Sequence, residues 1–322
     1  MNWFVSPARL RAAGVLGMNA RNIRQIAAEN KRKYYPIVDD KTLTKKAAMA
    51  AGITVPKLIG VVDNMHDVRD LAAIIGDQQQ FVIKPTRGSG GKGILVIVRR
   101  EDEYFIKPSG MRLKLDDLKR DVSNILSGLY SLGGKPDKAL IEELILFDDQ
   151  LQSYSYEGVP DIRVIIFRGY PVMAMIRCPT HASDGKANLH QGGVGVGLDI
   201  ATGRATYATQ YNRKVMKHPD TGIAFEELRV PQWEELLVLA SRCYELTKMG
   251  YIGCDIVIDK RYGPMILELN ARPGLAIQIA NQTGLKHRLD KVRELKQPHA
   301  TQAEKVAWAM AEFRHPFLLG DG

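Results

Sequence analysis

The sequence has few cysteines and lacks the long apolar run that a membrane helix needs. Cys178, Cys243 and Cys254 are odd in number and widely spaced, which excludes a disulfide framework or a zinc-ligand cluster and fits a reducing cytosol. No run of about 18 apolar residues occurs, so no membrane span is predicted. The first 22 residues also lack the apolar core of a signal peptide. A chain of 322 residues, 45% hydrophobic and 25% charged, predicts a cytoplasmic globular protein with one large or two medium domains.

Acidic residues are scarce near the N-terminus. Residues 1–35 hold seven lysines and arginines against one acid, Glu29, and so carry +6 of the net charge of +9. The basic residues are Arg9, Arg11, Arg21, Arg24, Lys31, Arg32 and Lys33. Such a run is usually a solvated helical face, and the alternative is a contact with an acidic partner, a membrane surface or nucleic acid. No basic stripe with interleaved aromatics occurs, which disfavours nucleic acid.

The hydrophobic pattern predicts an α+β protein with mostly antiparallel sheets in two lobes. Helices are predicted at 42–53, 65–76, 116–132, 232–249 and 301–313. Strands are predicted at 55–62, 81–85, 94–98 and 138–146, and β-hairpins at 161–178 and 254–270. Trp233 and the leucines of 236–239 read as the core face of a helix.

A glycine-rich loop, TRGSGGKG at 86–93, lies between two predicted strands. Its G-x-G-x-x-G spacing needs a following helix to indicate a dinucleotide fold, and here a strand follows. Strand–loop–strand instead favours a flap over nucleotide phosphates, with Lys84 and Lys92 neutralising charge. The alternative is a flexible hairpin tip. A protein kinase is disfavoured because neither H-R-D nor D-F-G occurs downstream.

The stretch MILELN at 265–270 places two polar groups, Glu268 and Asn270, on one face of an apolar strand. A four-residue loop at 260–263 would close the hairpin and place the strand that contains Asp255 beside the strand that contains Glu268. The predicted pairs are Asp259 with Pro264, Val257 with Ile266, and Asp255 with Glu268. Two facing acids are unfavourable unless a cation lies between them, and oxygen ligands suit magnesium. The sequence therefore predicts a magnesium site at Asp255, Glu268 and Asn270, against the alternative of two solvent-facing acids.

Several segments together resemble ATP-grasp carboxylate–amine ligases, and within them the alpha-L-glutamate ligases that add glutamate to a ribosomal protein's C-terminus. They are VDDKTLTKKAAMAAGITVPK (38–57), FVIKPTRGSGGKGI (81–94), EELI (142–145), DIRV (161–164), MAMIR (173–177), ANLHQGG (187–193), GCDIVID (253–259) and ILELNARPGL (266–275). The resemblance covers roughly residues 38–285. It implies an ATP-grasp fold whose two lobes clamp ATP with Mg²⁺ or Mn²⁺.

The resemblance also implies roles for individual residues. Lys41, Lys84 and Asn188 would contact or approach the ATP phosphates, beneath the flap residues Gly88, Gly90, Gly91, Lys92 and Gly93. Glu143 and the Leu144 backbone would receive adenine, and Asp161 would accept from the ribose hydroxyls. Arg163 and Arg177 would hold the transferred phosphoryl group or an acyl phosphate. Asp255, Glu268 and Asn270 would carry the metal.

The chain departs from those ligases at several places. Only 40 residues precede Lys41, so the region before the ATP-grasp lobes is expected to be truncated, which leaves the acceptor open. Lys186 and Gln191 differ from the ligases' pattern, and the stretch 146–160 is long. Arg272 stands where those ligases often have a small residue, and we expect it to bind a substrate carboxylate bidentately. The predicted domains are a basic extension at 1–40, a small lobe at 41–140, a large lobe at 141–290, and a C-terminal helix and tail at 291–322.

The predicted function is ATP-dependent, ADP-forming ligation of a carboxylate to an amine through an acyl phosphate. By resemblance an amino acid such as glutamate would join a peptide, protein or small amine. The alternatives are a kinase-like phosphotransferase and a non-catalytic nucleotide-binding module. His190 could position phosphate, act as an acid or base, or be structural. Cys254 is expected to pack in the core, on the face opposite Asp255.

Overall fold

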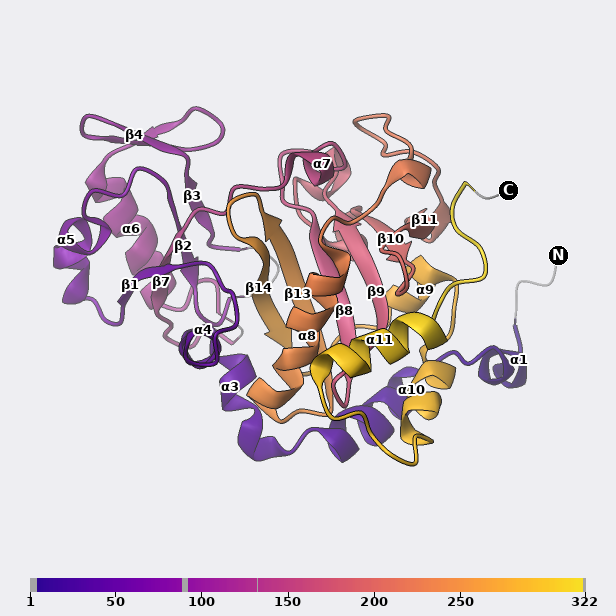
Figure 1. Ribbon diagram of the computed structural model, residues 1–322. Coiled ribbons are helices and arrows are strands. Elements are labelled where there is room, and N and C mark those ends of the chain that lie inside the picture. The colour runs from indigo at the N-terminus through magenta and orange to yellow at the C-terminus, as the bar shows by residue number, and fades with distance from the viewer. Residues whose placement is uncertain (1–4, 89–91, 132, 321–322) are drawn as a thin grey trace. The chain divides into compact units, whose positions relative to one another are not determined.

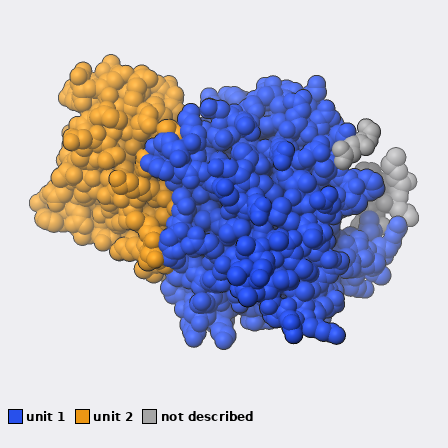
Figure 2. All heavy atoms as spheres, in the orientation of Figure 1, with its two compact units in different colours: residues 1–38, 51–54, 147–322 blue, residues 39–50, 55–146 orange. Residues whose placement is uncertain are grey.

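The computed structural model describes residues 5–88, 92–131 and 133–320 (Figure 1). The chain divides into two compact units, coloured separately in Figure 2. Unit 1 comprises Met1–Val38, Ala51–Thr54 and Phe147–Gly322, and unit 2 comprises Asp39–Ala50 and Val55–Leu146. The division into four domains at residues 40, 140 and 290 stays a prediction. Among the described residues, no helix is long and apolar enough to cross a membrane.

Unit 2 is built on a four-stranded antiparallel sheet. Its strand order is β1 (Leu58–Val62), β7 (Ala139–Glu143), β2 (Phe81–Pro85) and β3 (Leu95–Ile97). A smaller sheet contains β4 (Arg99–Glu101), β5 (Tyr104–Ile106) and β6 (Arg112–Leu113). The helices are α4 (Lys41–Ala50), a 3-10 turn (Asp67–Asp70), α5 (Leu71–Ile75) and α6 (Leu115–Leu126).

Helix α6 shows how the sequence pattern builds the core of unit 2. The Asp117 carboxylate accepts a hydrogen bond of 2.9 Å from the Lys114 backbone N–H, which satisfies one donor at the start of the helix. Leu118, Val122 and Ile125 recur at helical spacing and are buried. They belong to the same apolar cluster as the inward side chains of β2, so helix and sheet share one core.

Unit 1 is built on a seven-stranded antiparallel sheet. Its strand order is β12 (Arg213–Lys214), β11 (Ala205–Gln210), β10 (Val194–Leu198), β9 (Tyr170–Cys178), β8 (Asp161–Phe167), β13 (Tyr251–Asp259) and β14 (Gly263–Asn270). The longer helices are α8 (Trp233–Thr247), α10 (Leu285–Arg293) and α11 (Gln302–Glu312). Both predicted hairpins are present, as β8–β9 and β13–β14, and the α+β class is confirmed.

Short helices complete unit 1. They are α1 (Pro7–Ala12), α2 (Met18–Ala20), a π-helix (Arg21–Ala27), α7 (Asp149–Gln152), α9 (Ile277–Asn281), and 3-10 turns at Arg32–Tyr34, His181–Ser183, Leu189–Gln191 and Phe225–Glu227. Helix α3 (Pro36–Asp39) ends at the first residue of unit 2.

The two faces of the large sheet differ in chemistry. Helix α8 packs against one face, where the Cys254 thiol contacts the Ala240 carbonyl at 3.8 Å. Cys254 is fully buried, and Trp233, Leu236 and Leu237 are buried on α8, so these predictions of core packing are confirmed. Side chains alternate along a strand, and Asp255 therefore points to the opposite face. We call that opposite face the site face.

Candidate active site

A cluster of charged side chains lies on the site face of the unit 1 sheet, across β9, β8, β13 and the edge strand β14. Asp255 on β13 is paired directly with Arg163 on β8 and with Glu268 on β14. Arg177 on β9 is paired with Asp161 on β8. Residues directly opposite each other on neighbouring strands share a face. The sheet therefore gathers six predicted site residues, which we call the charged cluster: Asp161, Arg163, Arg177, Asp255, Glu268 and Asn270.

Asp255 is the centre of this cluster. Arg163 donates to both of its carboxylate oxygens, from Nε at 2.7 Å and from Nη2 at 2.6 Å. Arg177 Nη2 lies 3.0 Å from Asp255 Oδ2, and the Asn270 amide donates to the same oxygen at 3.1 Å. Asp255 is only 4% exposed. Charge-assisted bonds of this kind fix the side chains as well as stabilising them.

Asp161 binds the second guanidinium. Arg177 donates from Nε to Asp161 Oδ1 at 2.5 Å and from Nη2 to Oδ2. Burial and the nearby Asp255 carboxylate raise the pKa of Asp161, and Arg177 offsets part of that rise. The ribose contact expected for Asp161 stays a prediction, and its carboxylate is already committed to Arg177 in this structure.

The two carboxyls respond differently to the same surroundings. Burial tends to raise the pKa of Asp255, but Arg177 and Arg163 outweigh it and lower the pKa to about 2. This value lies below the ordinary 3.8. The ionised Asp255 therefore stabilises the folded state fully above about pH 4, and that contribution is lost as the pH falls towards 2.

This shift predicts a pH-dependent effect of the substitution Asp255→Asn. Near neutral pH the variant leaves two guanidiniums without their common partner, which should lower the free energy of unfolding by about 3–5 kcal/mol. At about pH 2.5 the carboxyl is largely neutral in the unfolded state and partly protonated in the folded state, so most of its contribution is lost and the difference should shrink. Urea unfolding of both proteins at the two pH values measures it. A difference that grows on acidification would contradict the assignment.

The hairpin register is partly as predicted. Asp255 pairs with Glu268, but Asp259 pairs with Gly263 and Val257 with Met265. Those two predicted pairs are wrong by one residue, because Gly263 takes a φ of +72° and joins the ladder instead of the loop. A register shift between Asp255 and Ile256 restores the pair that matters for the site.

The structure also changes the reason for expecting a metal. The acids were predicted to need a cation between them, and Asp255 already has two cations, Arg163 and Arg177. Among the described residues, no group of three or more His, Cys, Asp or Glu is placed to hold a metal ion. The donor set of two carboxylates and one amide still fits a hard cation that keeps several waters or phosphate oxygens. The metal site at Asp255, Glu268 and Asn270 stays a prediction.

Unit 2 contains a second buried charged cluster. The Glu142 carboxylate on β7 contacts Lys84 Nζ on β2 at 2.6 Å and also contacts Lys45 Nζ on α4. Burial lowers the pKa of Lys45 to about 8, with Glu142 opposing and Lys84 adding to the effect. Lys84 was predicted as a phosphate contact, whereas Lys45 and Glu142 were missed. Their sequence context, a polar helix and a short apolar strand, gave no sign that they meet.

The beginning of the glycine loop is held by a carboxylate that sequence reasoning also missed. Asp137 accepts from the Thr86 hydroxyl at 2.5 Å, from the Arg87 backbone at 3.0 Å and from the Ser131 hydroxyl at 2.8 Å. Lys41 Nζ donates to the Gly88 carbonyl at 3.2 Å. The loop leads into strand β3, as predicted. Lys92 and Gly93 are described, and Gly90 and Gly91 lie outside the described residues.

The remaining predicted residues have local partners. The Glu143 backbone N–H, at the end of β7, donates to the Lys57 carbonyl at 2.9 Å, and the adenine role of Glu143 and Leu144 stays a prediction. Asn188 lies in the loop between β9 and β10. Its side-chain oxygen accepts from the His190 backbone at 3.0 Å and caps the turn Leu189–Gln191.

Arg272 follows β14 and is exposed. Its guanidinium lies 4.5 Å from the ring centre of Tyr35, a cation–π contact within unit 1. If it binds a substrate carboxylate as predicted, Arg272→Ala should raise the KM for that substrate by about 10-fold or more, since a charge-assisted bond is worth about 1.5–3 kcal/mol. Tyr35→Leu is the control that removes the ring and keeps the cation. An unchanged KM in Arg272→Ala would contradict the role.

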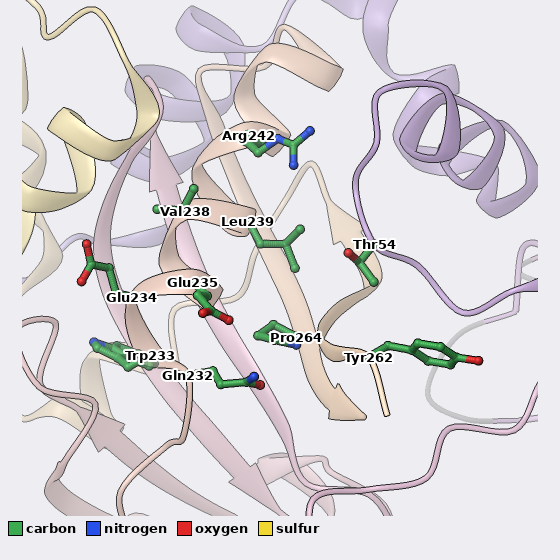
Figure 3. Close-up of a pocket in the computed structure, with 10 residues that line it drawn as sticks. All are labelled: Thr54, Gln232, Trp233, Glu234, Glu235, Val238, Leu239, Arg242, Tyr262 and Pro264. Atoms are coloured by element: carbon green, nitrogen blue, oxygen red, sulfur yellow. The ribbon is translucent and has the colours of Figure 1, made fainter. Parts of the chain in front are cut away.

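A pocket of about 640 Å³ lies elsewhere in unit 1, between α8 and the start of β14 (Figure 3). Its lining residues are Thr54, Gln232, Trp233, Glu234, Glu235, Val238, Leu239, Arg242, Tyr262 and Pro264. None of them belongs to the charged cluster. Arg242 donates to the Ala51 carbonyl at 2.6 Å, and the Trp233 indole donates to the Ile200 carbonyl at 2.8 Å. The volume of a pocket alone therefore does not identify where the predicted site residues lie.

Two antiparallel units, a glycine loop between strands and a carboxylate hairpin point to the ATP-grasp class. Residues 20–294 match the family described as sugar-transfer associated ATP-grasp, and the chain belongs to this family. The predicted ATP-grasp fold is thereby confirmed.

Curated relatives are similar over part of their length. A probable alpha-L-glutamate ligase of Xanthomonas oryzae pv. oryzae is 25% identical over 236 residues, which are 73% of this chain and 57% of the relative. The chain thus spans little more than half of that relative. Among solved structures, the ATP-grasp ligase PsnB with a minimal precursor has a TM-score of 0.46 at 13% identity, over 87% of this chain and 63% of that one. A RimK domain ATP-grasp protein of Sphaerobacter thermophilus has a TM-score of 0.45 at 14% identity, over 82% and 70%.

Proposed function

We propose that the chain is an ATP-dependent, ADP-forming ligase that joins a carboxylate to an amine. The observation that carries the proposal is the charged cluster, in which Asp255 is held by two guanidiniums directly opposite Glu268. Membership of an ATP-grasp family and the name of the curated relatives support the same class of reaction. Glutamate is the substrate that the relatives' name suggests.

The proposed reaction has two steps. An oxygen of the substrate carboxylate attacks the γ-phosphorus of ATP, the bond from that phosphorus to the β-phosphate oxygen breaks, and ADP leaves. The amine nitrogen then attacks the acyl carbon, inorganic phosphate leaves, and the nitrogen loses a proton to solvent. Neither step needs an enzyme nucleophile, which agrees with the absence of a Ser-His or Cys-His motif in the sequence.

The charged cluster would serve the first step by neutralising charge on the transferred group. Arg163 and Arg177 are fixed in place by carboxylates, so they need no reorganisation during the reaction. Asp161, Asp255 and Glu268 supply three acids against these two guanidiniums, and the resulting net charge favours binding of a cation. A magnesium ion at Asp255, Glu268 and Asn270 would add positive charge beside the phosphates. In unit 2, Lys84 and Lys41 would contact phosphate oxygens.

Trapping with hydroxylamine tests the reaction class. An acyl phosphate gives a hydroxamate, whereas the phosphate ester made by a kinase does not. We expect hydroxamate and ADP in equal amounts when ATP, Mg²⁺ and a suitable carboxylate are present. ADP without hydroxamate would favour a kinase. A lack of carboxylate-dependent ADP across a broad screen of amino acids and peptides would favour a non-catalytic nucleotide-binding module.

A further inference from the structure

A second, smaller pocket of about 250 Å³ lies in unit 1. It is lined by Leu189, His190, Gly193, Thr209, Tyr211, Asn212, Ala276 and Ile279. These residues come from three places: the loop that contains Asn188, the end of β11, and the segment that follows Arg272. Two of the three segments thus adjoin residues already predicted to act in the reaction.

The strand register places this pocket on the site face. Arg177 pairs with Gly195, and Gly195 pairs with Thr209, so the three lie in one row across β9, β10 and β11. Residues in such a row share a face. Strands are about 4.8 Å apart, which puts the Thr209 backbone about 10 Å from that of Arg177. The residue between them, Gly195, has no side chain, and Leu189 and Ala280 pack over it.

Small residues shape the walls of the pocket. A Cβ at Gly195 would lie 2.5 Å from Leu189 Cδ2 and 3.4 Å from Ala280 Cβ, so only glycine lets the loop and α9 approach the sheet. A Cβ at Gly192 would lie 2.3 Å from the Tyr211 hydroxyl. Tyr211 and Asn212 form the turn between β11 and β12 with φ of +50° and +62°. A two-residue hairpin turn of this kind has positive φ at both positions, and it places Tyr211 in the lining of the pocket.

The lining of this pocket is polar and apolar without a lysine, arginine or acid. None of its eight residues is Lys, Arg, Asp or Glu. Leu189, Ala276 and Ile279 offer apolar contact, and hydroxyl, amide and imidazole groups offer hydrogen bonds. Four of the eight lining residues are exposed, so a carboxylate here would be only partly dehydrated, but it would still lack a lysine or arginine partner, which is unfavourable. An uncharged group of a few heavy atoms would meet no such penalty.

We propose that this pocket takes the uncharged remainder of the carboxylate substrate, whose carboxylate is directed towards Arg177. The inference rests on the proposed ligase function and narrows it. The substrate is then a carboxylic acid, such as an amino acid, with a small uncharged side chain, and glutamate is a poor substrate.

The test compares matched carboxylates in the hydroxamate assay: glutamate, its amide glutamine, and norvaline. Glutamine and norvaline have uncharged side chains. We expect kcat/KM for the better of these two substrates to exceed that for glutamate by about 10-fold or more. Ile279 is exposed enough to accept a lysine. Ile279→Lys should therefore shift the ratio by about 10-fold towards glutamate. Leu129→Lys, at an exposed leucine of unit 2, adds the same charge elsewhere and should leave the ratio unchanged.

A second variant tests the tyrosine without altering charge. Tyr211→Ala should raise the KM for the preferred acid with little change in kcat, because the residue contacts the side chain and not the reacting group. Tyr262→Ala is the control, since Tyr262 is 54% exposed and Tyr211 is 59% exposed. A wild-type preference for glutamate that Ile279→Lys does not change would overturn this inference and leave the ligase function standing. If no carboxylate gave a hydroxamate, both would fall.

Discussion

Replacement of Glu268 by alanine should lower the rate of ADP release by at least about 100-fold, the loss typical when one preorganised electrostatic group is removed. Glu268 is half-buried and faces Asp255 across the hairpin. In the proposed site it would provide an oxygen for the cation that accompanies ATP. Asn270→Ala should act in the same direction, since Asn270 lies on the same face of β14 and bonds to Asp255.

The fold should survive the loss of Glu268, and this separates a role in the reaction from a structural one. Circular dichroism and the thermal midpoint of Glu268→Ala should stay close to those of the wild type. Glu235→Ala removes an exposed acid from α8, outside the charged cluster, and should keep full activity. ADP release at the wild-type rate from Glu268→Ala would refute the assignment of this residue.

Replacement of Glu142 by alanine should cost unit 2 about 3–5 kcal/mol of stability, because it leaves two buried lysines without their anion. The side chains of Lys45, Lys84 and Glu142 are 6%, 10% and 4% exposed. Burial alone would raise the pKa of Glu142, yet Lys84 and Lys45 hold it below the ordinary value. The ionised form is therefore the one that the fold requires.

An exposed ion pair in the same unit provides the matched control. Glu101 pairs with Arg99 at 2.6 Å, but their side chains are 40% and 61% exposed. Glu101→Ala should therefore cost less than about 1 kcal/mol. Amide exchange of β2 and β7 reports the opening of unit 2 separately from unit 1. If the amides of β2 and β7 exchanged equally fast in Glu142→Ala and Glu101→Ala, the buried cluster would not be a main source of stability in unit 2.

The carboxylate hairpin was predictable because alternation along a strand is a local property. Glu268 and Asn270 stand out against apolar neighbours, and their partner Asp255 follows from a nearby turn. The pairs closer to the turn were wrong because a bulge and the conformation of Gly263 are not encoded in the alternation. The contacts of Asp255 with Arg163 and Arg177 were missed for a different reason. Arg163 is 92 residues away in the chain, and only the order of the strands brings it close.

Helix ends and buried ion pairs were the least predictable features. The helix predicted at 116–132 ends at Leu126, since the chain turns at Gly128 with a φ of +83°. The helix predicted at 65–76 begins as a 3-10 turn. Lys45 lies in a polar helical segment, where a lysine is usually solvated. Its burial against Glu142 depends on how α4 packs against the unit 2 sheet. Such contacts are tertiary and leave no periodic signal.

The central claim is that the β13–β14 hairpin binds the divalent ion that accompanies ATP. Electron paramagnetic resonance of Mn²⁺ with a non-hydrolysable ATP analogue measures this binding without turnover. The wild type should bind the ion, and Glu268→Ala and Asn270→Ala should each weaken its affinity by about 10-fold or more, as expected for the loss of a metal-site oxygen. Equal Mn²⁺ affinity in the wild type and both variants would show that the ion binds elsewhere, and would contradict the claim.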